Sequence, residues 1–376
     1  MVKICHMTSA HGEEDVRVFQ KECISLARAG YEVYLVERGE SYEKQGVHIV
    51  GVGELPISRR KRMTKGAKRV YETALKLNAD IYHFHDPELL PWGLKLKKHG
   101  KHVVFDSHEN YSQQMKSKPY LPGWVSCILA AFYQRYERFA VRRMDAVVYP
   151  CTFQGELLYQ DVCPRVVLLD NVARLDKIYD QYQERKPPLS GPMCLFGSLS
   201  SSRCIIEIIK AAIKAEMPLL LAGAFTSEEY QEECLSLLEG HENIRWLGQL
   251  AHSEVISLLQ KMSVGLCPEK NILQYNTTDN LATKSYEYMA MGLPVIVSDY
   301  PFSRKMMDEY SYGVLVDPDD VDSIAEAMRY LCDHPDKAWQ MGQNGRRAIK
   351  ERFNWDMEQE KLFALYEDIL KNDERV

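Results

Sequence analysis

The feature that most constrains the fold of this chain is a rhythm of short β-branched runs separated by longer amphipathic stretches, which occurs twice. In the first half the runs predict strands at residues 2–7, 32–36, 47–52, 81–84, 103–105 and 146–149. In the second half they predict strands at residues 193–196, 219–221, 244–246, 264–267, 295–297 and 314–316. Because helices are expected between most of these strands, each half predicts βαβ units and a parallel sheet. The sequence therefore predicts an α/β protein with two doubly wound, Rossmann-like domains.

The connection between the halves is expected in residues 168–192, a polar stretch that contains Pro187, Pro188 and Pro192. A length of 376 residues with 45% hydrophobic content is enough for two cores. We therefore expect an N-terminal domain over 1–185 and a second domain over 186–353. The helical pattern of residues 354–376 predicts a last helix that crosses back to the first domain.

The composition excludes several classes of protein. A formal net charge of -6 provides no basic field for nucleic acid, so that any anion site must be local. No run of 18 apolar residues predicts a spanning helix, and the N-terminus lacks the apolar stretch of a signal peptide. The ten cysteines are scattered without a close pair, which indicates reduced core residues of a cytosolic protein.

The first candidate site is the segment Phe-Gly-Ser-Leu-Ser-Ser-Ser-Arg-Cys at residues 196–204. It forms a glycine- and serine-rich turn between a predicted strand and a predicted helix. Such a turn brings several N–H groups and the guanidinium of Arg203 to one point, which is an anion cradle. Taken alone, the segment could equally be an ordinary connection between a strand and a helix.

The second candidate site is residues 279–299, where a loop opens a short helix that ends at Gly292. The N–H groups of Leu281 to Thr283 and the dipole of this helix could face a diphosphate. Glu287, further into the helix, could accept two hydrogen bonds from a ribose diol. On composition alone, Glu287 would be interpreted as a solvated helix acid.

With these segments the chain resembles the GT-B glycosyltransferases, specifically the retaining glycosyltransferase family 4, over nearly its whole length. The second domain of that family opens with Gly, Arg, Leu, three variable residues, Lys and Gly. The present chain has Gly197, Ser198, Leu199, three serines, Arg203 and Cys204. The resemblance implies that Arg203 meets the donor phosphates, and that Ser198 stands where members often carry a second phosphate-binding arginine.

The acidic signature of the family, two glutamates separated by seven residues, is matched by Asp279 and Glu287. The resemblance implies that Asp279 contacts the hydroxyls of the donor sugar and that Glu287 holds the ribose. Lys284 matches a lysine of a related subset and is expected to be a second cation near the phosphates, while the segment around Leu247 resembles the one whose backbone meets the base. The implied donor-binding residues are Gly197, Ser198, Arg203, Leu247, Asn280, Leu281, Ala282, Thr283, Lys284 and Glu287.

In the first half, residues 11–36, 80–90 and 103–111 resemble the polysaccharide-building branch of the family. His108 stands at the place of the family's donor-sugar histidine, although a lone histidine is more often structural. The resemblance thus implies a catalytic set of His108, Arg203 and Asp279. The candidates for the acceptor side, or for shaping a cleft between the domains, are His11, Asp15, Arg17, His85, Asp86 and Glu109.

The expected function is the retaining transfer of a hexose from a nucleotide sugar, with uridine as the family's commonest base, to a glycan or lipid-linked acceptor in cell-surface polysaccharide synthesis. The resemblance implies front-face attack without a carboxylate nucleophile. Asp317-Pro318-Asp319 is interpreted as a turn that caps a helix, so that no catalytic metal or cofactor is expected. Two alternatives stay open: a GT-B nucleotide-sugar epimerase and a catalytically silent GT-B partner subunit.

Two segments of the first domain could contact a membrane. Residues 57–69 form a basic patch, and residues 120–143 combine aromatic and apolar residues with a basic end. Together they could seat the first domain on the anionic inner face of the cell membrane, as a peripheral contact of a cytoplasmic protein. The alternative is a solvated face beside a core helix.

Overall fold

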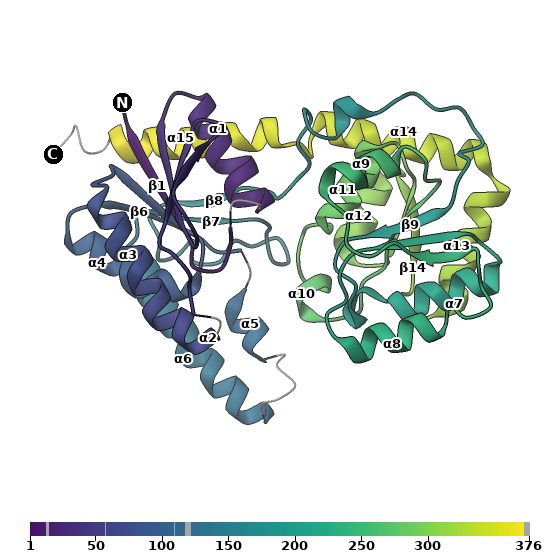
Figure 1. The fold of residues 1–376 in the computed structure, drawn as a ribbon, viewed down its shortest axis with the longest axis horizontal. Coiled ribbons are helices and arrows are strands. Elements are labelled where there is room, and N and C mark those ends of the chain that lie inside the picture. The colour runs from purple at the N-terminus through teal and green to yellow at the C-terminus, as the bar shows by residue number, and fades with distance from the viewer. Residues whose placement is uncertain (13–14, 57, 109, 117–121, 372–376) are drawn as a thin grey trace. The chain divides into compact units, whose positions relative to one another are not determined.

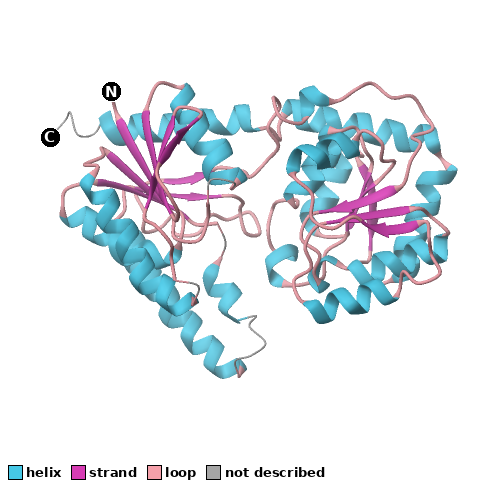
Figure 2. Cartoon of the chain, viewed as in Figure 1, coloured by secondary structure: helices cyan, strands magenta, loops and turns pink. Residues whose placement is uncertain are grey.

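The computed structural model describes the chain except for residues 13–14, 57, 109, 117–121 and 372–376. Its contacts divide the chain into two compact units. Unit 1 consists of Met1–Asn171 together with Asp356–Val376, and unit 2 consists of Val172–Trp355. Figure 1 shows the elements of both units along the chain, and Figure 2 shows that each unit is a sheet covered by helices.

Unit 1 is built on an eight-stranded sheet with the order β3-β4-β2-β1-β5-β6-β7-β8. Only the edge pair β3–β4 is antiparallel, and the other pairs are parallel. Its strands are β1 (Lys3–Met7), β2 (Glu32–Glu37), β3 (Tyr42–Lys44), β4 (Val47–Gly51), β5 (Ile81–Phe84), β6 (His102–Asp106), β7 (Ala146–Tyr149) and β8 (Val166–Leu168). Its helices and turns are η1 (Val16–Cys23), α1 (Ile24–Arg28), α2 (Arg59–Lys61), η2 (Arg62–Gly66), α3 (Ala67–Lys76), η3 (Pro87–Leu89), α4 (Leu90–Lys98), α5 (Tyr111–Lys116), α6 (Gly123–Val141) and α15 (Trp355–Lys371).

Unit 2 is built on a six-stranded, wholly parallel sheet with the order β11-β10-β9-β12-β13-β14. Its strands are β9 (Met193–Phe196), β10 (Leu219–Ala222), β11 (Ile244–Trp246), β12 (Gly265–Cys267), β13 (Val295–Ser298) and β14 (Gly313–Val316). Its helices and turns are η4 (Tyr179–Gln181), η5 (Ser201–Arg203), α7 (Ile205–Ala215), α8 (Glu228–Ser236), α9 (His252–Leu259), α10 (Leu273–Asn276), α11 (Thr283–Ala290), α12 (Pro301–Tyr310), α13 (Val321–Asp333) and α14 (Pro335–Glu351). Two apolar clusters form its core.

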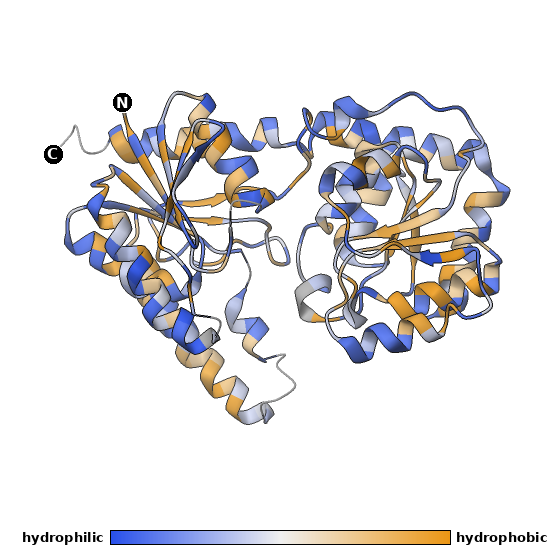
Figure 3. Ribbon diagram, in the orientation of Figure 1, coloured by the Kyte–Doolittle hydropathy of each residue, from blue (hydrophilic) through white to orange (hydrophobic). Residues whose placement is uncertain are grey.

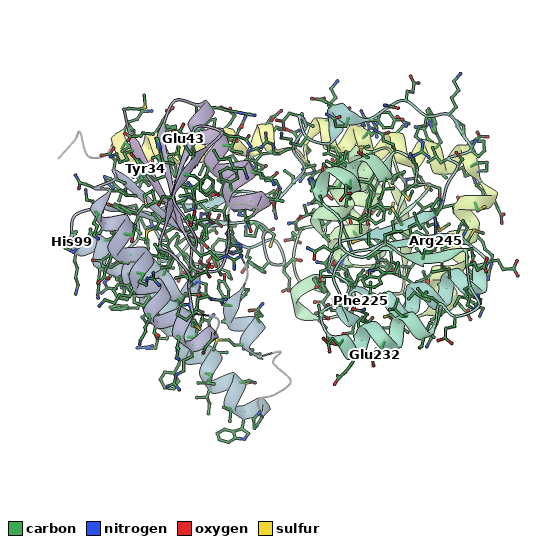
Figure 4. The ribbon with its side chains drawn as sticks, in the orientation of Figure 1. Tyr34, Glu43, His99, Phe225, Glu232 and Arg245 are labelled. Carbon is green, nitrogen blue, oxygen red and sulfur yellow. The ribbon has the colours of Figure 1, made fainter. Side chains whose placement is uncertain are left out.

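The strands predicted from the sequence are confirmed, each within one residue at either end. Strands β3 and β8, each three residues long, were not predicted from the sequence. At the edge beyond β2, the ring of Tyr34 stacks on that of His48 at 4.9 Å, and His48 Nδ1 lies 3.8 Å from Glu43 Oε2 of β3. Tyr34 and Glu43 are labelled in Figure 4. This edge strand pairs antiparallel with β4 and lacks the apolar pattern of the other strands.

The chain passes between the units earlier than the sequence indicates. The expected boundary was residue 185, whereas the contacts place it between Asn171 and Val172. Val172, Ala173 and Ile178 are buried in the core of unit 2, which explains this difference. The backbone N–H of Trp355 donates to the carbonyl of Ala173 at 2.9 Å, so that the residues next to both crossings are joined within unit 2.

The last helix, α15, belongs to unit 1 from Asp356 onward. Tyr366 is fully buried, and its hydroxyl lies 2.6 Å from His83 Nδ1 on β5. The carboxylate of Glu358 accepts a hydrogen bond from the backbone N–H of Asp170 at 2.8 Å. Residues from the two ends of the chain therefore form one core in this unit.

The cysteines are all free, but they are not all core residues as the sequence analysis expected. Cys127 and Cys332 are exposed, and the others are buried. Cys127 lies on α6 and Cys332 on α13, each on a helix face that packing leaves open. Among the described residues, no helix has both the length and the apolar character needed to span a bilayer.

A close backbone contact supports the packing of α14 in unit 2, and it yields a stability prediction. A Cβ atom at Gly342 would lie only 2.0 Å from the carbonyl oxygen of Gly292. We expect Gly342→Ala to lower the free energy of unfolding by about 1–3 kcal/mol through overpacking. The control is Gly123→Ala, where a Cβ meets nothing within 4 Å. Thermal unfolding midpoints check this, and equal midpoints for the two variants would contradict it.

Candidate functional site

The strand order of unit 2 places its candidate site at the carboxyl ends of β9 and β12. The order reverses between these neighbouring strands, and open parallel sheets bind ligands in the crevice at such a switch point. The loop after β9 contains Arg203, and the loop after β12 contains Glu269. The backbone N–H of Lys270 donates to the carbonyl of Ser202 at 2.8 Å, which joins the two loops.

Arg203 reaches this point because the chain turns sharply after β9. Gly197 has a φ of 121°, and Cys204, the N-cap of α7, has a φ of 54°. The short turn η5 between them carries Arg203. Burial opposes the charge of Arg203, but the carboxylate of Glu269 raises its pKa above the usual range. The guanidinium is therefore charged, as a phosphate site requires.

Lys284 is a buried cation at the same place. It lies in the first turn of α11, is 6% exposed, and has no hydrogen-bond partner for its Nζ atom within the described part of the chain. Burial lowers the pKa of Lys284, and the charge of Arg203 lowers it further. Cys267 and Glu269 oppose this shift. Two of the cations expected from the sequence thus act on each other across this site.

Glu269 is a site residue that the sequence analysis missed. Its Oε1 atom is buried without a hydrogen-bond partner among the described residues. Burial raises its pKa, while the charges of Lys284 and Arg203 oppose that shift. The available signal was its position two residues after the predicted strand 264–267. Glu269 therefore interacts electrostatically with both cations.

A pocket of unit 2 adjoins these groups. Its lining includes Glu269, Tyr275, Asn280, Leu281, Ala282 and Tyr300. The side chain of Asn280 accepts a hydrogen bond from the hydroxyl of Tyr286 at 2.7 Å, and the N–H of Leu281 donates to that hydroxyl at 3.3 Å. The Leu281 N–H, which was expected to face a diphosphate, is therefore already engaged inside the protein.

The other predicted donor residues lie on the same carboxyl edge or on α11. Glu287 is on α11, and its Oε1 atom lies 3.0 Å from His252 Nε2 at the start of α9. Leu247 directly follows β11, and its N–H donates to the carbonyl of Leu221 at 2.9 Å. The remaining residues of this set are Gly197, Ser198, Asp279 and Thr283, in the loops after β9 and β12 and at the start of α11.

In unit 1 the strand order also reverses between neighbours, at β1 and β5. The loops after these strands meet at Asp86, whose Oδ2 atom accepts hydrogen bonds from the Thr8 hydroxyl at 2.9 Å and from the Ser9 N–H at 2.6 Å. Asp86 is buried, and His11 Nε2 lies 3.6 Å from its Oδ1 atom. Asp86 therefore organises the loop that presents His11.

Asp15 caps the π-helical turn η1 and holds His11. Its Oδ1 atom accepts hydrogen bonds from the N–H groups of Arg17 and Val18, and its Oδ2 atom lies 2.7 Å from His11 Nδ1. Burial opposes the Asp15 charge, but the hydrogen bonds from His11 and Val18 bring its pKa well below the usual range. Burial likewise opposes protonation of His11, yet Asp15 and Asp86 raise the His11 pKa.

Arg17 and Asp106 form a buried ion pair behind this loop. The Nε and Nη2 atoms of Arg17 donate to both Asp106 oxygens at 3.0 and 3.1 Å, and its Nη1 donates to the carbonyl of Leu169 at 2.8 Å. Glu22 Oε1 lies 3.2 Å from Arg17 Nε. Burial raises the pKa of Glu22 well above its usual range, whereas Arg17, against the effect of burial, holds that of Asp106 well below.

His108 lies at the end of this network. Its Nε2 atom is 3.2 Å from His85 Nδ1, its ring is 5.0 Å from that of His11, and it is partly exposed. Burial lowers the pKa of His108 to about 3, so that the ring is neutral near pH 7. His85 and Arg17 are buried, as is Asp86, whereas His11 and Asp15 are partly exposed. Glu109 lies outside the described residues.

One group of unit 1 has the composition of a metal site. Ligand atoms of Glu22, His83, His85 and Asp106 lie within 4.8 Å of one another. Arg17 Nε already lies 3.2 Å from Glu22 and 3.0 Å from Asp106. A divalent cation bound here would face that guanidinium, which disfavours it electrostatically. The absence of a catalytic metal stays a prediction.

Several solved structures have the same fold as this chain. Sucrose-phosphate synthase from Thermosynechococcus elongatus has a TM-score of 0.76 at 18% identity, covering 99% of this chain and 100% of that chain. Anabaena Alr3699/HepE, solved in complex with UDP and glucose, has a TM-score of 0.70 at 13% identity, covering 98% of this chain and 100% of that chain. These likenesses identify the two parallel-sheet, Rossmann-like units as the GT-B fold.

Related sequences are similar over most of the chain. The GDP-mannose:cellobiosyl-diphosphopolyprenol alpha-mannosyltransferase of Xanthomonas oryzae pv. oryzae is 22% identical over 78% of this chain and 75% of its own length. The phosphatidyl-myo-inositol mannosyltransferase of Mycobacterium leprae is 23% identical over 79% of this chain and 75% of its own length.

Two family models divide the chain between them. The model for glycosyltransferase family 4 matches residues 16–173 in unit 1 and its border, and the model for glycosyl transferases group 1 matches residues 199–348 in unit 2. Together they include the predicted site residues except His11, Asp15, Gly197 and Ser198. The chain therefore belongs to the group 1 glycosyltransferases of glycosyltransferase family 4, and it is a glycosyltransferase with the GT-B fold.

Proposed function

We propose that this glycosyltransferase moves a hexose from a nucleoside diphosphate sugar to a hydroxyl of a glycan or lipid-linked acceptor, with retention of configuration. The observation that carries the proposal is the pair of cations at the switch point of unit 2, the partly exposed Arg203 and the buried Lys284. Departure of a nucleoside diphosphate builds negative charge on its phosphate, and preorganised cations in a dry site stabilise that charge strongly. In this proposal Glu287, in the same helix as Lys284, holds the ribose, and Asp279 contacts the sugar.

The retaining course is supported by the chemistry of unit 1. His108 is neutral near pH 7, since burial lowers its pKa to about 3, so that it is suited to exchange hydrogen bonds with sugar hydroxyls rather than to carry charge. In the proposed front-face reaction the leaving phosphate takes the proton of the acceptor hydroxyl. No carboxylate nucleophile and no metal ion is part of this mechanism.

The donor base and the acceptor class are open to direct test. The family resemblance favours a UDP sugar, and Anabaena Alr3699/HepE was solved with UDP-glucose. The Xanthomonas relative is named for GDP-mannose and a diphosphopolyprenol-linked acceptor, and the Mycobacterium leprae relative for phosphatidyl-myo-inositol. Both acceptor names contain a lipid, which supports a lipid-linked acceptor in cell-surface polysaccharide synthesis.

Helix α6 supports contact with a membrane. Trp124 and Phe132 are 70% and 71% exposed, and further large apolar residues of α6 are exposed. The full set of exposed large apolar residues on this helix is Trp124, Ile128, Leu129, Phe132, Tyr136 and Phe139. Figure 3 shows this apolar character along α6. With Arg135, Arg142 and Arg143 exposed on or beside the helix, the surface suits an anionic leaflet better than a role as a core helix.

The proposed reaction is tested by incubating the full-length protein with UDP-glucose or GDP-mannose and a polyprenyl diphosphate glycan acceptor. We expect transfer from one donor, release of the nucleoside diphosphate, and a product anomer equal to that of the donor by NMR. Addition of EDTA should leave the rate unchanged. If the protein changes the sugar when the donor is present alone, it is an epimerase. If neither transfer nor hydrolysis of the donor occurs, it is a silent subunit. A product with inverted configuration would refute retention.

Glu287 provides a test of the donor site. We expect Glu287→Ala to weaken donor binding by about 1.5–3 kcal/mol, as for the loss of hydrogen bonds to a charged group. Isothermal titration calorimetry with the donor measures this loss. Glu239→Ala changes an exposed acid elsewhere in unit 2 and serves as the matched control. Equal donor affinities for the two variants would remove Glu287 from the site.

The exposed face of α6 provides a test of membrane contact. We expect the Trp124→Ala/Phe132→Ala double variant to bind vesicles that contain anionic lipid at least tenfold more weakly, since each buried apolar side chain contributes about 1.5–3 kcal/mol. Co-sedimentation measures this, and binding should weaken with salt. Met357→Ala removes an exposed apolar side chain from α15 and is the control. If the binding of the wild-type protein to vesicles depends neither on anionic lipid nor on salt concentration, the membrane contact is refuted.

A further inference from the structure

Four imidazoles and one phenol form a continuous hydrogen-bonded chain in unit 1, from helix α15 to His108. The hydroxyl of Tyr366 lies 2.6 Å from His83 Nδ1 and 3.3 Å from His6 Nε2. His6 Nδ1 lies 2.9 Å from His85 Nε2. His85 Nδ1 in turn lies 3.2 Å from His108 Nε2. Every ring except His108 is fully buried, so that no water competes for these bonds.

A chain of imidazoles in which each ring carries one N–H group has a direction. Each neutral ring has one N–H group and one lone pair, so that a proton on one nitrogen makes the other nitrogen an acceptor. Burial lowers the pKa values of His6 and His83 well below the usual range, and that of His108 to about 3. The tautomer of each ring therefore constrains the tautomer of the next.

The buried carboxyl groups select one direction. Asp106 Oδ2 lies 3.5 Å from His85 Nδ1 and 3.7 Å from His108 Nε2. The shorter distance favours the proton on His85 Nδ1. Glu22 Oε2 lies 3.8 Å from His6 Nδ1. In this direction the nitrogens that carry N–H groups, His85 Nδ1, His6 Nδ1 and His83 Nδ1, lie 3.5, 3.8 and 3.9 Å from an oxygen of Asp106 or Glu22. In the reverse direction the corresponding nitrogens, His108 Nε2, His85 Nε2 and His83 Nε2, lie farther away, at 3.7, 4.0 and 4.0 Å.

In the resulting order each group donates a hydrogen bond toward His108. His83 Nδ1–H donates to the oxygen of Tyr366, whose O–H donates to His6 Nε2. His6 Nδ1–H donates to His85 Nε2, and His85 Nδ1–H donates to His108 Nε2. His108 must then carry its proton on Nδ1, the ring nitrogen that this chain does not use.

We propose that Tyr366, His6 and His85 are positioning residues that fix His108 in the Nδ1–H tautomer and so present a hydrogen-bond donor to a sugar oxygen. The identity of that ligand rests on the proposed function, whereas the tautomer does not. The C-terminal helix thereby contributes to the site of unit 1 through Tyr366 without touching a substrate. The role of Tyr366 goes beyond packing, since its hydroxyl joins His83 to His6 in the chain.

The test is NMR of full-length protein labelled with ¹⁵N-histidine. Two-bond ¹H–¹⁵N correlations report which ring nitrogen carries the proton, and His108→Gln identifies the His108 signals. We expect the wild-type His108 to be protonated on Nδ1 alone. In Tyr366→Phe the donor to His6 is lost, and we expect His108 to gain the Nε2–H tautomer. Wild-type His108 protonated on Nε2, or an unchanged tautomer in Tyr366→Phe, would overturn the proposal.

Kinetics with the same variants separate positioning from folding. We expect Tyr366→Phe to lower kcat roughly five- to tenfold, the cost of about one hydrogen bond, with an unchanged KM for the donor. The matched control is Tyr312→Phe in unit 2, which removes another buried hydroxyl that has no hydrogen-bond partner in the described residues. We expect it to change neither the His108 tautomer nor kcat. If no transfer is observed, the tautomer of His108 still decides this proposal independently of the proposed reaction.

Discussion

The ion pair between Arg17 and Asp106 is the interaction on which the polar interior of unit 1 depends. Its two hydrogen bonds bury a full charge of each sign, and such a pair is tolerated only where the geometry is good and the remaining polar atoms have partners. Asp106 then orients His85, and through it His108, while Glu22 is stabilised in its protonated form. Removing either partner would leave an uncompensated charge among buried imidazoles.

In unit 2, too, acidic and basic side chains interact, and here the basic side chains belong to the candidate donor site. The carboxyl group of Glu269 lies in the field of two basic side chains, Arg203 and Lys284, whose charges oppose the rise of its pKa on burial. The proposed anion site is therefore local, in a protein whose formal net charge is -6. In the proposed reaction the cations of unit 2 face the leaving group, and His108 of unit 1 exchanges hydrogen bonds with sugar hydroxyls.

Parallel strands are the reason why these groups come together. In each unit the strand order reverses between two neighbours, β1 and β5 in unit 1 and β9 and β12 in unit 2. The loops after those strands carry His11, Asp86, Arg203 and Glu269. The fold therefore provides two equivalent edges, and the difference between their functions lies in the residues that follow the strands.

The sequence by itself determined the two sheets, because strand runs such as 81–84 and 193–196 are apolar enough to be recognised without their neighbours. It also indicated Arg203, Lys284 and Glu287, which lie in contiguous motifs. Only the tertiary structure decided that Glu269 interacts electrostatically with those cations, that Val172 belongs to unit 2, and that Tyr366 reaches His6. These relations join residues far apart along the chain, and neither burial nor hydrogen-bond distance is encoded in local spacing.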